Sequence, residues 1–171
     1  LRGGTPEVLC SVASFGRGGS WGSKDVIVFA AGSEGPLFSI SKDGGTPKPV
    51  TVLDSAQTGH RFPRFLPDGR HFLYASMPPR GSQFTIYIGS IDSPQREQLL
   101  IADGTPVYVD PGYLLYVRNG RVVAHRFDAG RRKLTGEPIA LADEPRRSDF
   151  LGSPSVIAAT RGSAFLYYRH V

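Results

Sequence analysis

The sequence predicts an all-β protein in which one cassette of four short strands recurs along the chain. Three observations lead to this prediction. Short apolar runs alternate with turns throughout, since 21 Gly and 14 Pro are spread over the 171 residues. No segment sustains the i, i+3, i+4, i+7 apolar spacing of an amphipathic helix. Similar apolar runs also return at intervals of about 43 residues, which is a sign of an internal repeat.

Each of the first three repeats opens on an aromatic residue that precedes a turn. Trp21, Phe65 and Tyr108 follow one another at intervals of 44 and 43 residues. A turn that contains Gly or Asp comes next, and a second apolar run follows it, with the sequences VIVFA (26–30), HFLYA (71–75) and YLLYV (113–117). The run AFLYY (164–168) has the same character and is expected to belong to a fourth repeat.

Two further strands complete each cassette. The third runs are LFSI (37–40), TIYIGSI (85–91) and VVAHRF (122–127), and the fourth are KPVTVL (48–53), EQLLIA (97–102) and EPIALA (137–142). Four strands in about 40 to 50 residues is the spacing of propeller blades. A sandwich or barrel also has short strands at regular spacing, but it does not require the same cassette to recur. We therefore expect a β-propeller fragment of about three to four four-stranded blades.

The longer strings resemble a known family. GGTPKPVTVL, HRFPRFLPDGRHFLYAS, PGYLLYVRNGRVVAHRFD and LTGEPIALAD are similar to the TolB-like (PD-type, WD-like) propeller repeats found downstream of bacterial eukaryotic-like serine/threonine protein kinases. The resemblance implies a single partial propeller over residues 1–171, with blades at 15–53, 60–102 and 105–143 and an incomplete one at 148–171. The first turn, GSKD, departs from the Ser-Pro-Asp-Gly hairpin of the family. Because closed propellers have about 4 to 8 blades, we expect part of the ring to be missing.

The stretch HRFPRFLPDGRHFLYAS (60–76) gathers charged residues around Pro-Asp-Gly and could be an active site, a phosphate-binding cradle or a turn. We predict a two-residue hairpin turn at Asp68-Gly69, because this dipeptide tolerates positive φ and Pro67 sets the bend. A phosphate cradle would need several glycines that open a helix. His60 has the placement of the histidine that links strands in WD-type blades, so we interpret it as structural.

We expect no catalytic, cofactor-binding or metal site in this chain. GGSWG (18–22) matches the G-x-S-x-G elbow around Ser20, but an elbow needs a helix after the turn. HRFD (125–128) lacks the downstream Asn of a kinase catalytic loop. The histidines are spread along the chain without the i, i+4 pairing of a helical metal site, and the aspartates lack calcium-loop spacing. Those histidines are His60, His71, His125 and His170. The lone Cys10 excludes an internal disulfide.

The distribution of charge indicates which classes of binding partner to expect. The formal net charge is +5, but the arginines are scattered and only Arg131-Arg132-Lys133 forms a cluster, so we expect no nucleic-acid partner. No apolar run is long enough for a membrane span. The predicted function is a sensory or protein-binding module in which loop side chains such as Arg80, Gln83 and Arg131–Arg132 meet a protein or peptide partner.

The parent protein is expected from the resemblance alone. It implies a larger bacterial protein such as a receptor serine/threonine kinase, with the propeller on the extracytoplasmic side of the membrane. An accessory propeller of a hydrolase or peptidase is the alternative, and a small independent β-sandwich is a third. An open arc of blades also leaves apolar faces uncovered, so we expect residues 1–171 alone to self-associate.

Overall fold

The computed structural model describes residues 5–12, 15–78, 83–143, 157–159 and 165–167. These residues form strands and turns, and none of them lies in a helix. Three four-stranded antiparallel sheets follow one another along the chain, and in each the strands are hydrogen-bonded in sequence order. The all-β class is therefore the predicted one. Within the described ranges, no helix is long and apolar enough to cross a membrane.

Each sheet forms one blade. Blade 1 comprises β1 (Gly19–Trp21), β2 (Val26–Ala30), β3 (Leu37–Ser41) and β4 (Gly44–Pro49). Blade 2 comprises β5 (Gly59–Phe65), β6 (His71–Met77), β7 (Phe84–Ser90) and β8 (Ser93–Ala102). Blade 3 comprises β9 (Val107–Val109), β10 (Tyr113–Arg118), β11 (Arg121–Asp128) and β12 (Lys133–Asp143). A two-stranded hairpin of β13 (Ile157–Ala159) and β14 (Phe165–Tyr167) follows.

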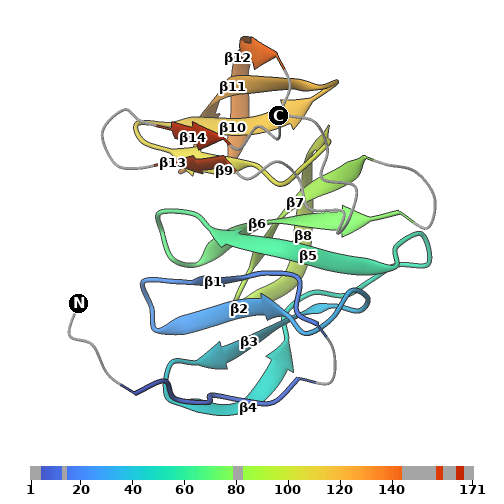
Figure 1. Cartoon of the computed structure of the whole chain (residues 1–171), viewed down its shortest axis with the longest axis vertical. Helices are drawn as coiled ribbons and strands as arrows, with labels where there is room; N and C mark the ends of the chain where they lie inside the picture. The colour runs from blue at the N-terminus through green and yellow to red at the C-terminus, as the bar shows by residue number, and fades with distance from the viewer. Residues whose placement is uncertain (1–4, 13–14, 79–82, 144–156, 160–164, 168–171) are drawn as a thin grey trace.

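The blades are stacked along the long axis of the molecule, with blade 2 between the other two (Figure 1). Alternate residues of β6 therefore enter two different cores. Phe72 and Tyr74 pack with blade 1, whereas Leu73 and Ala75 pack with blade 3. All four are fully buried, which explains why the second strand of a blade reads as a continuous apolar run.

The outer strand of blade 1 differs from the prediction. The fourth run was expected at 48–53, but β4 occupies Gly44–Pro49. Gly44 and Gly45 adopt positive φ, and Gly44 pairs with Ser41, so a tight turn starts the strand early. Residues 50–58 instead form the connection to blade 2, in which the Val50 N–H donates to the Leu37 carbonyl and Thr51 is buried.

The turn between β5 and β6 is longer than the two-residue hairpin predicted at Asp68-Gly69. Four residues lie between Leu66 and His71, and the Leu66 N–H donates to the His71 carbonyl at 2.8 Å. The Gly69 N–H donates to the Leu66 carbonyl at 3.0 Å, and Gly69 has a φ of 61°. Asp68 does not have positive φ, and its carboxylate closes the loop by accepting the N–H groups of Arg70 and His71, each at 2.9 Å.

Candidate functional site

Most of the structural residues predicted from the sequence line one cleft. Its volume is about 400 Å³, and it lies at the ends of the first strands of the three blades. Five of the seven predicted structural residues line it, namely Trp21, Phe65, Pro67, Gly69 and Tyr108. Asp68 lies in the same hairpin, whereas His60 is at the opposite end of β5. The other lining residues are Ser20, Gly22, Ser23, Arg64, Leu66, Val107 and Asp110.

The seam between blades 1 and 2 closes one side of this cleft. Ser20, in β1, accepts the backbone N–H of Phe65, in β5, at 3.0 Å. Gly22 lies against the Phe65 ring so closely that an added Cβ would come within 2.9 Å of two ring carbons. A Cβ on Gly69 would lie 2.0 Å from the Ser23 hydroxyl oxygen. Glycine at positions 22 and 69 therefore lets the two hairpins meet.

The Asp68 carboxylate holds the blade 2 hairpin in place. Its Oδ2 lies 2.5 Å from His71 Nδ1, in addition to the two backbone bonds that it accepts. Partial burial raises the pKa of Asp68, but the hydrogen bonds from the His71 side chain and from the His71 and Arg70 amides outweigh it and lower the pKa below its ordinary value. The Asp68 carboxylate therefore serves to stabilise the turn.

The seam between blades 2 and 3 forms the open side of the cleft. Arg64 pairs with Leu73 in the register, and Tyr108 pairs with Leu114. Leu73 and Leu114 both belong to the core between these blades, so Arg64 and Tyr108 face one another across the seam. Asp110 follows β9 on the Tyr108 side.

Two polar side chains on this open side, Arg64 and Tyr108, have shifted pKa values. Burial lowers the pKa of the Arg64 guanidinium, although the residue still reaches solvent. Burial raises the pKa of the Tyr108 hydroxyl, and the neighbouring Asp110 carboxylate raises it further. Among the described residues, the Arg64 side chain has neither a hydrogen-bond acceptor nor an ion-pair partner. The cleft thus carries an unpaired cation on blade 2 and a carboxylate on blade 3.

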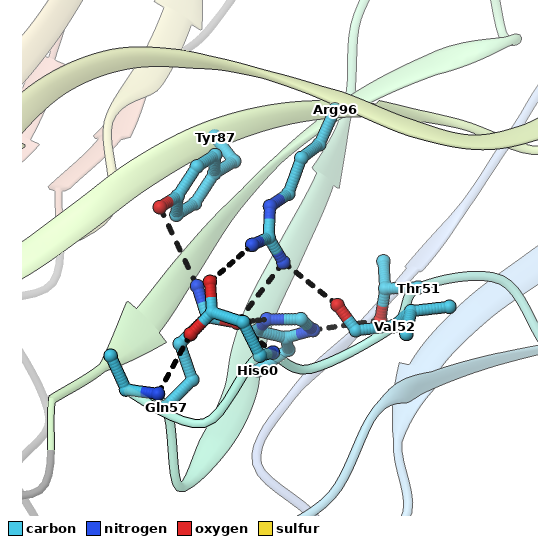
Figure 2. A network of polar contacts seen from close by, with 8 residues as sticks. Thr51, Val52, Gln57, His60, Tyr87 and Arg96 are labelled. Carbon is cyan, nitrogen blue, oxygen red and sulfur yellow. Dashed lines mark hydrogen bonds and ion pairs between the residues drawn. The ribbon is translucent and has the colours of Figure 1, made fainter.

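His60 takes part in a separate, buried network that ties blade 2 to the connection from blade 1 (Figure 2). Its Nδ1 lies 2.8 Å from Thr51 Oγ1, which accepts the Leu37 N–H at 2.8 Å, and its Nε2 lies 3.1 Å from Gln57 Oε1. Because an amide oxygen only accepts, Nε2 carries the proton and Nδ1 accepts the Thr51 hydroxyl proton. The imidazole also contacts the Tyr74 ring edge-on, with centroids 4.8 Å apart.

Arg96, from β8, closes this network. It donates to the Val52 carbonyl at 2.7 Å and to Gln57 Oε1 at 3.0 Å, and it pairs with Asp54 at 2.6 Å. Burial and, to a smaller extent, the Arg96 charge lower the pKa of His60 to about 4, although Asp54 opposes the change. The ring is therefore neutral at physiological pH, and the network holds β5 and β8 to the connection from blade 1.

The side chains that could carry chemistry have other partners. Ser20 accepts a backbone N–H, and β1 leads into another strand rather than a helix, so the nucleophile-elbow geometry is missing. His125 accepts from the Tyr116 hydroxyl at 3.0 Å and donates to the Gly136 carbonyl at 2.9 Å. In the described part of the chain, no group of three or more His, Cys, Asp or Glu is placed to hold a metal ion. His170 and Arg80 lie outside the described residues.

Comparisons with known proteins concern the fold. No protein-family profile matches the sequence, and no curated protein matches it. Among similar solved structures is regucalcin of Agrobacterium tumefaciens strain C58, described as a calcium-binding protein, with a TM-score of 0.55 and 18% identity over 73% of this chain and 44% of that chain. Another is an oligogalacturonate lyase in complex with manganese, with a TM-score of 0.50 and 15% identity over 77% of this chain and 37% of that chain.

Both similar structures are β-propellers, so the predicted fold class is confirmed. The chain spans less than half the length of either one. At these identities the likeness shows the fold alone. It does not show that the propeller is of the TolB-like type or that it belongs to a kinase. The division of residues 1–171 into one partial propeller with the stated blade limits stays a prediction.

Proposed function

We propose that this chain is a non-catalytic β-propeller segment that binds part of a partner protein in the cleft at the ends of β1, β5 and β9. The observation that carries the proposal is the composition of the cleft. Each of the three blades contributes an aromatic residue to its lining, and Arg64 of blade 2 and Asp110 of blade 3 add a guanidinium and a carboxylate. Concave sites with apolar walls and a few convergent polar groups are the usual places for ligand binding.

The non-catalytic part of the proposal is supported by how the polar side chains are used. Ser20, His60, His71 and His125 each bond to a neighbouring group that stabilises a turn or a seam between strands. Two of these bonds join a hydroxyl to an imidazole, Thr51 to His60 and Tyr116 to His125, but both are buried and lie outside the cleft. Any kinase or hydrolase activity is therefore assigned to other parts of the parent protein.

The parent is proposed on the sequence resemblance alone. We propose a bacterial receptor serine/threonine kinase that carries this TolB-like propeller on the extracytoplasmic side. The flanking coding sequence tests it directly. A V-A-I-K strand and an H-R-D loop would support the kinase, whereas G-x-S-x-G in a strand-turn-helix context would support the alternative of a propeller accessory to a peptidase.

Site-specific photo-crosslinking tests the binding function. A photoreactive residue is placed at Pro67, which is exposed and lines the cleft, and in a matched variant at Ile139, which is 60% exposed on β12. Irradiation in cells that express the protein is expected to give a discrete covalent adduct from position 67 alone. Equal adducts from both positions, or none from position 67, would contradict binding in the cleft.

A further inference from the structure

The two walls of the open seam in the cleft have opposite charge. Blade 2 presents Arg64, and blade 3 presents Tyr108 and Asp110. A guanidinium offers parallel N–H donors that match the two oxygens of a carboxylate. Solvent screens an ion pair inside a cleft less than a pair in open water, so the pair is stronger there.

We infer that the cleft recognises a short peptide segment of a partner protein in which one acidic side chain pairs with Arg64 and a neighbouring residue packs on the aromatic walls. This inference rests on the proposed binding function and names the class of ligand. Tyr108 and Phe65 supply the walls, and Trp21 lies at the edge of the cleft with 61% of its surface exposed. Aromatic side chains of this kind anchor peptides because they bury a large area at small entropic cost.

Asp110 favours a peptide over a polyanion. A nucleic acid or polyphosphate that paired with Arg64 would bring further negative charge toward Asp110 and would be repelled. A peptide with one acidic side chain has backbone N–H donors on either side of it, and the Asp110 carboxylate can accept such donors. The distribution of charge in the cleft therefore selects an isolated carboxylate.

A display library of random heptapeptides, panned against the whole chain, tests this inference. The enriched peptides are then synthesised, and their binding is followed by the fluorescence of Trp21, the single tryptophan of the chain. We expect each enriched peptide to contain one Asp or Glu beside an apolar or aromatic residue. Replacing the acidic residue of the peptide by Asn or Gln is expected to weaken binding about 10-fold or more, as for loss of a charge-assisted hydrogen bond.

Three variants separate the possible outcomes. R64Q should lose about 10-fold or more in affinity. R126Q has the same net charge, lies at an exposed position of β11 outside the cleft, and should bind like the wild type. S23W fills the cleft and should abolish binding, which is measured for this variant by the fluorescence polarisation of a labelled peptide because the variant has two tryptophans. Far-UV circular dichroism and thermal melting confirm that each variant is folded.

The outcomes distinguish this inference from the function on which it rests. If S23W abolishes binding but the peptides lack an acidic residue, or R64Q binds as tightly as the wild type, the acidic-peptide inference is wrong and the cleft remains a binding site. If no peptide is enriched, or S23W binds normally, the proposed binding function itself is contradicted.

Discussion

The imidazole Nδ1 of His60 lies 2.8 Å from the hydroxyl oxygen of Thr51, and this contact joins the first strand of blade 2 to the segment that arrives from blade 1. The same hydroxyl accepts the N–H of Leu37, in β3, so three elements meet at one oxygen. His60 is 1% exposed. A buried network in which every member has a partner fixes one arrangement of the elements that it joins.

Removing the imidazole should destabilise the protein. His60→Ala leaves a cavity and takes away one partner each of the Thr51 hydroxyl and Gln57 Oε1, so we expect a loss of about 2–4 kcal/mol in the free energy of unfolding. Denaturant unfolding followed by circular dichroism measures it. The matched control is His71→Ala, whose partner Asp68 lies on the surface, and it should cost about 1 kcal/mol or less. An unchanged melting temperature in His60→Ala would show that the network is not structural.

The same histidine should make stability depend on pH. The pKa of His60 is about 4 in the folded protein, against an ordinary value of 6.5 that applies when the chain is unfolded. Between these values the unfolded state binds the additional proton, so stability is fully present above pH 6.5 and is lost as pH falls toward 4. The difference corresponds to about 3 kcal/mol.

Unfolding free energies measured from pH 7 to pH 4 check this dependence, and His60→Gln provides the comparison. The variant should lose most of the slope between pH 6.5 and 4. The lowered pKa of Asp68 acts in a different window, because its contribution is lost only as pH falls below the ordinary value of 3.8. An equal slope in the wild type and His60→Gln would assign the effect to another group.

Gly69 should tolerate no side chain, for two separable reasons. Its φ of 61° is unfavourable for other residues, and a Cβ would lie 2.0 Å from Ser23 Oγ. Gly136 has a similar φ of 70° but no heavy atom within 4 Å of an added Cβ. We therefore expect Gly136→Ala to cost about 1 kcal/mol and Gly69→Ala to cost more.

A double variant isolates the steric part of this effect. Gly69→Ala combined with Ser23→Ala removes the hydroxyl that the new Cβ meets, so part of the lost stability should return. Thermal melts of the four proteins measure the coupling. If Gly69→Ala and Gly136→Ala cost the same, the hairpins of blades 1 and 2 do not meet as closely as the structure indicates.

The position of the cleft follows from the sequence only in part. Trp21, Phe65 and Tyr108 were recognisable because they recur at one position of the cassette, and equivalent positions of stacked blades lie side by side. Periodicity therefore identified the aromatic lining. Arg64 and Asp110 have no repeat signature, since their placement depends on which face of β5 and which end of β9 meet across the seam.

The local sequence also did not determine the length of the turns. The Pro-Asp-Gly hairpin was predictable, but its four-residue length depends on the bond between Leu66 and His71 and on the Asp68 carboxylate. In blade 1 the Gly44-Gly45 pair began the outer strand ahead of its apolar residues. Composition shows that a turn is present, whereas the register of the flanking strands decides its extent.

The face of blade 1 that points away from blade 2 carries several apolar side chains. Phe29 pairs with Phe38, and their rings lie 6.2 Å apart at the centroids. Trp21 pairs with Ile27 on the same face, because residues directly opposite one another in a sheet share a side. Val28 and Leu37 point the other way, into the core with blade 2.

This face should cause residues 1–171 to self-associate when they are produced alone. Apolar patches larger than about 400 Å² are rarely exposed by monomeric proteins, and a second copy can cover this one face to face. Sedimentation velocity at increasing protein concentration is expected to show dimers or larger species. Phe38→Lys places a charge on the face and should shift the protein toward monomer, whereas Ile139→Lys, on β12 of blade 3, should not. A monodisperse monomer with a sharp cooperative melt at every concentration would show that the face needs no cover.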